Sequence, residues 1–144
     1  RERFSYAGNY YATSSILGNS ELLKLVQWNE EQNDHDDWDY SIRLFAACQG
    51  RVAQVDKTLV QLNQGSADSL SMNRSWKRSL NFVERFPKDI FGRSKADFML
   101  VHVLLPAILK MELSGIKAWM RNSPRAFPRL GAIARFLAGV LMRR

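Results

Sequence analysis

The sequence predicts an all-α fold, in the form of a single compact bundle of five to six helices. Apolar residues recur at three- and four-residue spacing along most of the chain, which is the periodicity of a helix buried on one side. Few stretches alternate apolar and polar residues as a half-buried strand does. The 144 residues match the usual size of one domain, and the 46% of hydrophobic residues is an ordinary globular value.

We therefore expect residues 1–144 to form one helical domain. Because the chain begins with Arg1 and shows no signal-peptide pattern, we expect a fragment or a processed part of a longer chain. A lone cysteine, Cys48, cannot form an intramolecular disulfide, which favours an intracellular and more specifically a cytoplasmic location. The longest strongly apolar stretch, residues 98–109, is shorter than the roughly 20 residues of a transmembrane helix.

The chain opens with two helical segments. Residues 4–16 are rich in tyrosine, although Gly8 interrupts the pattern. Ser20 is a suitable N-cap, and the helix that follows it is expected to end near Gln32.

A long helix is predicted next, over about residues 38–64, or two helices joined near Gly50. Apolar residues step by fours and threes through this segment, which is the narrow seam of a helix bundle or coiled coil. The later part of the seam predicts helix–helix association through Val52, Val55, Leu59 and Leu62.

Two helices are expected in the middle of the second half. One begins near Trp76, and Pro87 closes it. The other begins at Ser94, which together with Asp97 has the spacing of a capping box. Pro106 falls inside this second helix and predicts a kink there.

A short helical piece after Gly115 and a basic amphipathic C-terminal helix complete the expected bundle. Ser123 and Pro124 have the residue types of an N-cap and a first helical residue. The apolar positions of the last helix are Phe127, Leu130, Ile133, Phe136, Leu137, Val140 and Leu141. We expect this apolar face to pack in the core, with binding to a membrane surface as the alternative.

The charge of the chain is divided along its length. Residues 1–64 contain six Lys and Arg against nine Asp and Glu, whereas residues 65–144 contain fifteen against five. An excess of this size favours a polyanionic partner, namely nucleic acid, anionic lipid or an acidic protein surface. The alternative is that the acidic connector, residues 30–39, folds over the basic face of the same chain.

Two tryptophans in the basic part, Trp76 and Trp119, are each flanked by a cation two residues before and a cation two residues after. On a helix two residues span about 200°, so each pair of cations shares one face and the tryptophan points the opposite way. This spacing predicts buried tryptophans beneath exposed cations. The candidate polyanion-binding residues are Arg74, Lys77, Arg78, Lys117, Arg121, Arg125 and Arg129.

No residue pattern points to a catalytic centre. Phosphate-binding glycine loops, nucleophile elbows and zinc-ligand spacings are absent from the sequence, so we expect no catalytic residue, cofactor or metal. The acidic connector carries His35, but helix capping already accounts for its aspartates. His102 and Cys48 lie on apolar helix faces and are expected to be core residues.

The leading hypothesis from sequence is therefore a non-enzymatic helical module of a larger protein or assembly that contacts a nucleic-acid backbone through its basic second part. The first alternative is a helical adaptor that binds another protein through the seam of the long helix or through the apolar face of the last helix. The second is peripheral binding to a membrane surface by the C-terminal helix.

Overall fold

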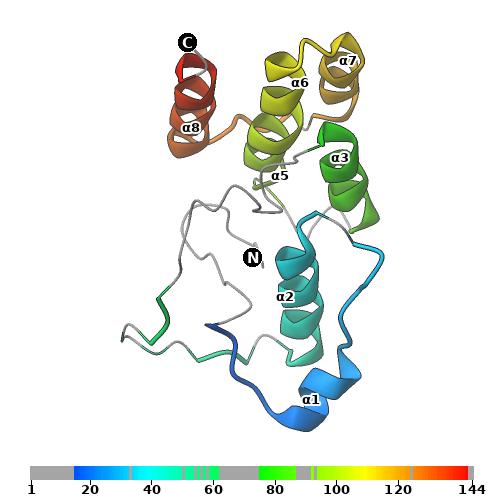
Figure 1. Cartoon of the computed structure of the whole chain (residues 1–144), viewed down its shortest axis with the longest axis vertical. Coiled ribbons are helices and arrows are strands. Elements are labelled where there is room, and N and C mark those ends of the chain that lie inside the picture. Colours follow the sequence, from blue (N-terminus) through cyan, green and yellow to red (C-terminus); the bar gives the residue numbers. More distant parts are fainter. Residues whose placement is uncertain are drawn as a thin grey trace. The chain divides into compact units, whose positions relative to one another are not determined.

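The structure is a computed structural model that describes residues 15–32, 34–49, 51–53, 55, 57, 59–61, 75–86, 92, 94–123 and 125–142. Within these ranges the regular structure is helical and contains no strand (Figure 1). The elements form six helices when the contiguous segments of residues 94–109 are taken as one, so the predicted all-α class and helix number are confirmed. Most of the helix expected over residues 4–16 lies outside the described residues, which begin at residue 15.

Contacts between residues divide the chain into two compact units. One comprises residues 10–72, and the other comprises residues 1–9 together with 73–144. We call the described part of the first the acidic unit, because it contains seven Asp and Glu against four Lys and Arg. The described part of the second, the basic unit, contains three Asp and Glu against ten Lys and Arg. The charge division seen in the sequence thus coincides with the division into units, and a single domain over residues 1–144 stays a prediction.

The acidic unit begins with a helix shorter than predicted. Helix α1 covers Ser20–Leu25 and is capped by Asn19, whose side chain accepts hydrogen bonds from the backbone N–H groups of Glu21 and Leu22. The predicted end near Gln32 is wrong, because the backbone already leaves the helix at Val26.

The long helix predicted over residues 38–64 is also wrong. Helix α2 covers Asp36–Ala47 and ends where Gln49 adopts a left-handed backbone with φ of 54°. A left-handed residue just past the last turn is a common helix stop, and its N–H donates here to the carbonyl of Ala46. The described residues between 51 and 61 are not helical.

The predicted association seam loses its basis for the same reason. Val52, Val55 and Leu59 are exposed, but they lie outside any helix and share no helix face. Leu62 lies outside the described residues. The β-branched residues of this segment have low helix propensity, so the three-and-four spacing alone does not produce a helix.

The basic unit is built around one central helix that runs from residue 94 to residue 109. It consists of α5 (Ser94–Phe98), the π-helical segment η3 (Met99–Leu104) and α6 (Leu105–Leu109). Helices α3 (Trp76–Arg85), α7 (Leu113–Asn122) and α8 (Leu130–Leu141) all contact it. In Figure 1, α8 lies to one side of the central helix and α3 and α7 lie to the other. The end of α3 before Pro87 confirms the predicted helix there.

The central helix changes its hydrogen-bonding pattern directly before Pro106. Proline has no backbone N–H, and in an α-helix its ring crowds the carbonyl of the residue four positions earlier, here His102. The C-cap of the π-helical segment is Leu105, whose N–H donates to the carbonyl of Leu100 five residues back. A π-helical segment is one of the known causes of a helix kink, but the kink predicted at Pro106 itself stays a prediction.

Trp76 joins α3 to the start of α7. Its indole N–H donates to a carboxylate oxygen of Glu112, the N-cap of α7. Gly115, expected between two helices, lies inside α7, and a Cβ atom on it would stand 2.5 Å from Cβ of Ala107 and 2.9 Å from Cε2 of Trp76. Only glycine permits this close approach, so Gly115 is required for the packing of three helices.

Replacing this glycine tests the packing. Gly115→Ala is expected to lower the free energy of unfolding by about 1–3 kcal/mol, because the added methyl group meets two buried neighbours. Gly131→Ala in α8 is the matched control, since a Cβ atom there meets nothing within 4 Å. The control is expected to raise stability by up to about 1 kcal/mol through helix propensity. Chemical denaturation of both variants measures the difference, and equal effects would contradict the packing.

Candidate polyanion-binding surface

The structure describes six of the seven candidate cations. Lys77 and Arg78 are exposed in the first turn of α3, and Lys117 and Arg121 are exposed on α7. Arg125 is exposed in the segment before α8. The remaining two are Arg129, which is partly buried at the N-cap of α8, and Arg74, which lies outside the described residues.

The orientation of the tryptophans agrees with the helical spacing. Trp76 is buried, while Lys77 beside it is exposed and carries its ammonium nitrogen 5.7 Å from the centre of the indole ring. Trp119 is half-buried and packs against the cluster of Leu100, Val101, Leu104 and Ala132. Neither ring is presented as an open platform for stacking on bases, which leaves the cations as the contact groups.

The cations of α7 form a short stripe on its outward face. Lys117 and Arg121 are four residues apart and therefore neighbours on the helix surface. Leu113 and Met120 are also exposed on this face, so it combines positive charge with apolar area.

Few carboxylates balance these cations on the surface. Of the three Asp and Glu in the described part of the basic unit, only Glu84 is exposed. Glu112 accepts the hydrogen bond from Trp76, and Asp97 is buried with 1% of its surface exposed. Among the described residues of this unit, exposed Lys and Arg thus outnumber exposed Asp and Glu, and such an excess of positive charge raises the local concentration of anions.

Asp97 has a different partner from the one that the capping-box spacing predicts. Its Oδ1 accepts a hydrogen bond of 2.6 Å from the backbone N–H of Arg129, and its Oδ2 lies 3.6 Å from a guanidinium nitrogen of the same residue. That nitrogen is also 3.5 Å from the hydroxyl oxygen of Ser94. Arg129 therefore anchors the start of α8 to the central helix, and we leave it out of the proposed surface.

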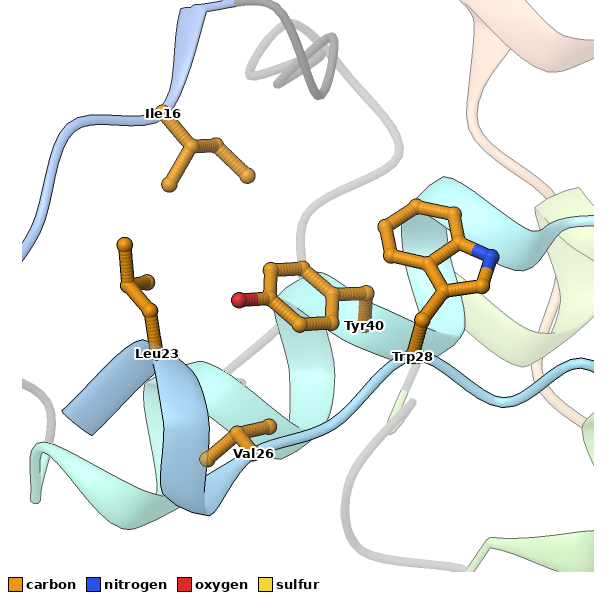
Figure 2. Close-up of a pocket in the computed structure, with 5 residues that line it drawn as sticks. All are labelled: Ile16, Leu23, Val26, Trp28 and Tyr40. Atoms are coloured by element: carbon orange, nitrogen blue, oxygen red, sulfur yellow. The ribbon is translucent and has the colours of Figure 1, made fainter. Parts of the chain in front are cut away.

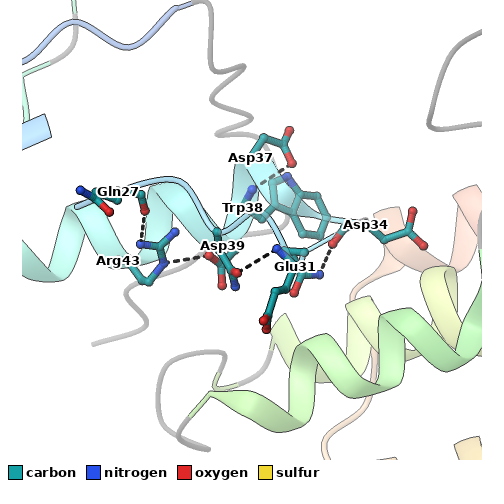
Figure 3. A network of polar contacts seen from close by, with 9 residues as sticks. Gln27, Glu31, Asp34, Asp37, Trp38, Asp39 and Arg43 are labelled. Atoms are coloured by element: carbon teal, nitrogen blue, oxygen red, sulfur yellow. Dashed lines mark hydrogen bonds and ion pairs between the residues drawn. The ribbon is translucent and has the colours of Figure 1, made fainter. Parts of the chain in front are cut away.

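The acidic connector of the other unit is organised by helix α2 (Figure 3). Asp36, Asp37 and Asp39 stand in its first turn, where a helix N-terminus favours negative charge. The N-cap is His35, which has left-handed backbone angles.

One aspartate of α2 belongs to a buried ion pair. Asp39 is buried and pairs with Nε of Arg43 at 2.8 Å, and Arg43 also donates to the carbonyl of Gln27 at 2.7 Å. Across the residues that can be described, no three His, Cys, Asp or Glu side chains gather as a metal site.

The acidic unit also contains an open apolar pocket of about 300 Å³ (Figure 2). Its lining residues are Ile16, Leu23, Val26, Trp28 and Tyr40. The rings of Trp28 and Tyr40 lie 4.9 Å apart between centroids. Sequence reasoning missed this pocket because its walls come from three separate segments, and only the aromatic residues on either side of the acidic connector hint at it.

Comparisons with protein-family models, curated proteins and solved structures found no match. In the part of the chain that the structure covers, each helix is too short or too polar to cross a membrane.

Removing the carboxylate of Asp97 tests its role in holding α8. Asp97→Asn is expected to lower the free energy of unfolding by about 1–3 kcal/mol, because it weakens a buried ion pair and a backbone hydrogen bond. Arg125→Gln is the control, since Arg125 is exposed and four residues before Arg129, and it is expected to leave stability within about 0.5 kcal/mol. Thermal or urea unfolding distinguishes the two, and an Asp97→Asn protein as stable as the parent would contradict the role.

Proposed function

We propose that the basic unit contacts the phosphate backbone of a nucleic acid, as a non-enzymatic module of a larger intracellular protein or assembly. The proposed contact residues are Lys77, Arg78, Lys117, Arg121 and Arg125. The observation that carries the proposal is the surface charge of the described part of this unit, in which exposed cations outnumber exposed carboxylates, of which Glu84 is the one described. The nucleic-acid backbone is a dense array of negative charge that exposed Lys and Arg neutralise.

The packing of the basic unit supports a contact with fixed geometry. Because Trp76 contacts both Glu112 and Gly115, the first turns of α3 and α7 are held next to each other. Lys77 lies in the first turn of α3, and Lys117 directly follows the first turn of α7. Contacts with phosphates position a protein on nucleic acid without reading bases, which suits a surface whose tryptophans are turned inward.

The adaptor hypothesis is weaker after the structure. One of its two docking surfaces was a helical seam through Val52, Val55 and Leu59, and these residues are not helical. The other, the apolar face of the last helix, stays a prediction. The idea that the acidic connector covers the basic face stays a prediction, which charge neutralisation of Glu30 and Glu31 tests directly. Tighter nucleic-acid binding by Glu30→Gln/Glu31→Gln would support it.

The central test is the salt dependence of binding to a DNA duplex and an RNA duplex of arbitrary sequence. Fluorescence anisotropy is expected to show binding at low salt that falls steeply as salt rises, with similar affinity for both duplexes. Lys117→Gln/Arg121→Gln is expected to reduce the slope of log K against log salt by about two, roughly one for each phosphate that the variant no longer neutralises.

Lys24→Gln is the matched control, because Lys24 is an exposed lysine of the acidic unit and pairs with Glu21. It is expected to leave the slope unchanged. Absence of binding to either duplex at low salt would contradict the proposed function. Equal slopes for all three proteins would place the contact elsewhere on the chain.

A further inference from the structure

Helix α8 carries an apolar stripe on its outward face. Leu130, Leu137 and Leu141 are 85%, 52% and 65% exposed, and Ala134 stands between the first two. The spacing of four, three and four residues places these side chains on one face of the helix. A Cβ atom added to Gly131, beside this stripe, would meet nothing within 4 Å, so the face is open.

The stripe is separate from the face of α8 that packs in the core. Ala132 is buried against the central helix, and Ile133 and Phe136 pack on the same cluster. The sequence predicts one apolar face for this helix, whereas the structure divides its apolar residues between an inward and an outward face. Exposed leucines on a continuous stripe need another explanation than core packing.

Charge around the stripe indicates what covers it. Residues 113–144 contain seven Lys and Arg and no Asp or Glu. Arg135 follows Ala134 by one residue, so it lies about 100° around the helix from the stripe. Phe127 and Met142, which are 77% and 82% exposed, extend the apolar area at its two ends.

We propose that α8 binds the surface of a membrane that contains anionic phospholipids. The helix lies parallel to the membrane plane, the leucine stripe inserts among the acyl chains, and cations of the basic segment 113–144 contact lipid phosphates. With 12 residues the helix is about 18 Å long, which suits the interface and not a span of the bilayer.

A second copy of the chain is a poorer occupant of the stripe. Two copies that meet at this stripe would bring two segments of the same net positive charge together, because residues 113–144 contain no Asp or Glu. An anionic lipid surface instead complements the arginines and takes up the leucines at the same time.

This proposal extends beyond nucleic-acid binding, because it uses α8 and the proposed nucleic-acid contact uses chiefly α3 and α7. The two surfaces also differ in composition. The outward face of α7 alternates cations with Leu113 and Met120, whereas the stripe of α8 consists of leucine and alanine alone.

Co-sedimentation of the full chain with vesicles tests the proposal. Vesicles of phosphatidylcholine mixed with phosphatidylserine are expected to bind the protein, and vesicles of phosphatidylcholine alone are expected to bind it at least about tenfold more weakly. Leu137→Gln/Leu141→Gln is expected to lower binding to the mixed vesicles by about tenfold or more. Leu17→Gln is the matched control, because Leu17 is 99% exposed in the acidic unit, and it is expected to bind as the parent does.

A labelled variant gives a second measurement that does not depend on loss of binding. In a Cys48→Ser background, an environment-sensitive dye on Leu137→Cys is expected to shift its emission to the blue when mixed vesicles are added. The same dye on Leu17→Cys is expected to show no shift.

Three results would overturn the proposal. The first is unchanged vesicle binding by the stripe variant together with no dye shift at residue 137. The second is loss of vesicle binding only in Lys117→Gln/Arg121→Gln, which would assign the lipid contact to α7. The third is lipid-independent self-association of the parent that the stripe variant abolishes, which would make a second copy the occupant.

Discussion

The basic unit depends on one constraint, which is that its central helix must be buried on every side. Every residue from Ala96 to Ala107 is buried, and consecutive residues of a helix point in all directions around its axis. An apolar helix of this kind is stable only when neighbours surround it, and α3, α7 and α8 supply them. The outer faces of these three helices are therefore the surface of the unit, and their residues decide what it can bind.

The packing of this unit also shapes its surface charge. Two of the three described carboxylates hold helices together, since Asp97 binds Arg129 and Glu112 binds Trp76. Each of these contacts removes a negative side chain from solvent, because the carboxylate faces a partner inside the unit. The strong positive surface is thus partly a consequence of how the helices are joined, in addition to the excess of Lys and Arg in the sequence.

Local periodicity predicted the features that depend on one helix alone. The burial of Trp76 beneath exposed cations and the end of α3 before Pro87 follow from spacing within a few residues. Features that depend on distant partners were not predictable in this way. Asp97 has its partner 32 residues away, and Gly115 is explained only by Ala107 and Trp76 from other helices. The sequence did not predict the early end of α2, because the apolar spacing continues beyond Gln49, where the backbone is left-handed.

Both proposed surfaces bind phosphate groups, but their affinities are expected to depend differently on salt concentration. Binding through Lys117 and Arg121 is largely an exchange of counterions, so it weakens with every increase in ionic strength. Contacts of cations with lipid phosphates are screened in the same way, but the transfer of Leu137 and Leu141 out of water does not depend on salt. A chain that loses nucleic acid at high salt and keeps part of its affinity for vesicles therefore has an apolar contact with lipid that the nucleic acid does not use.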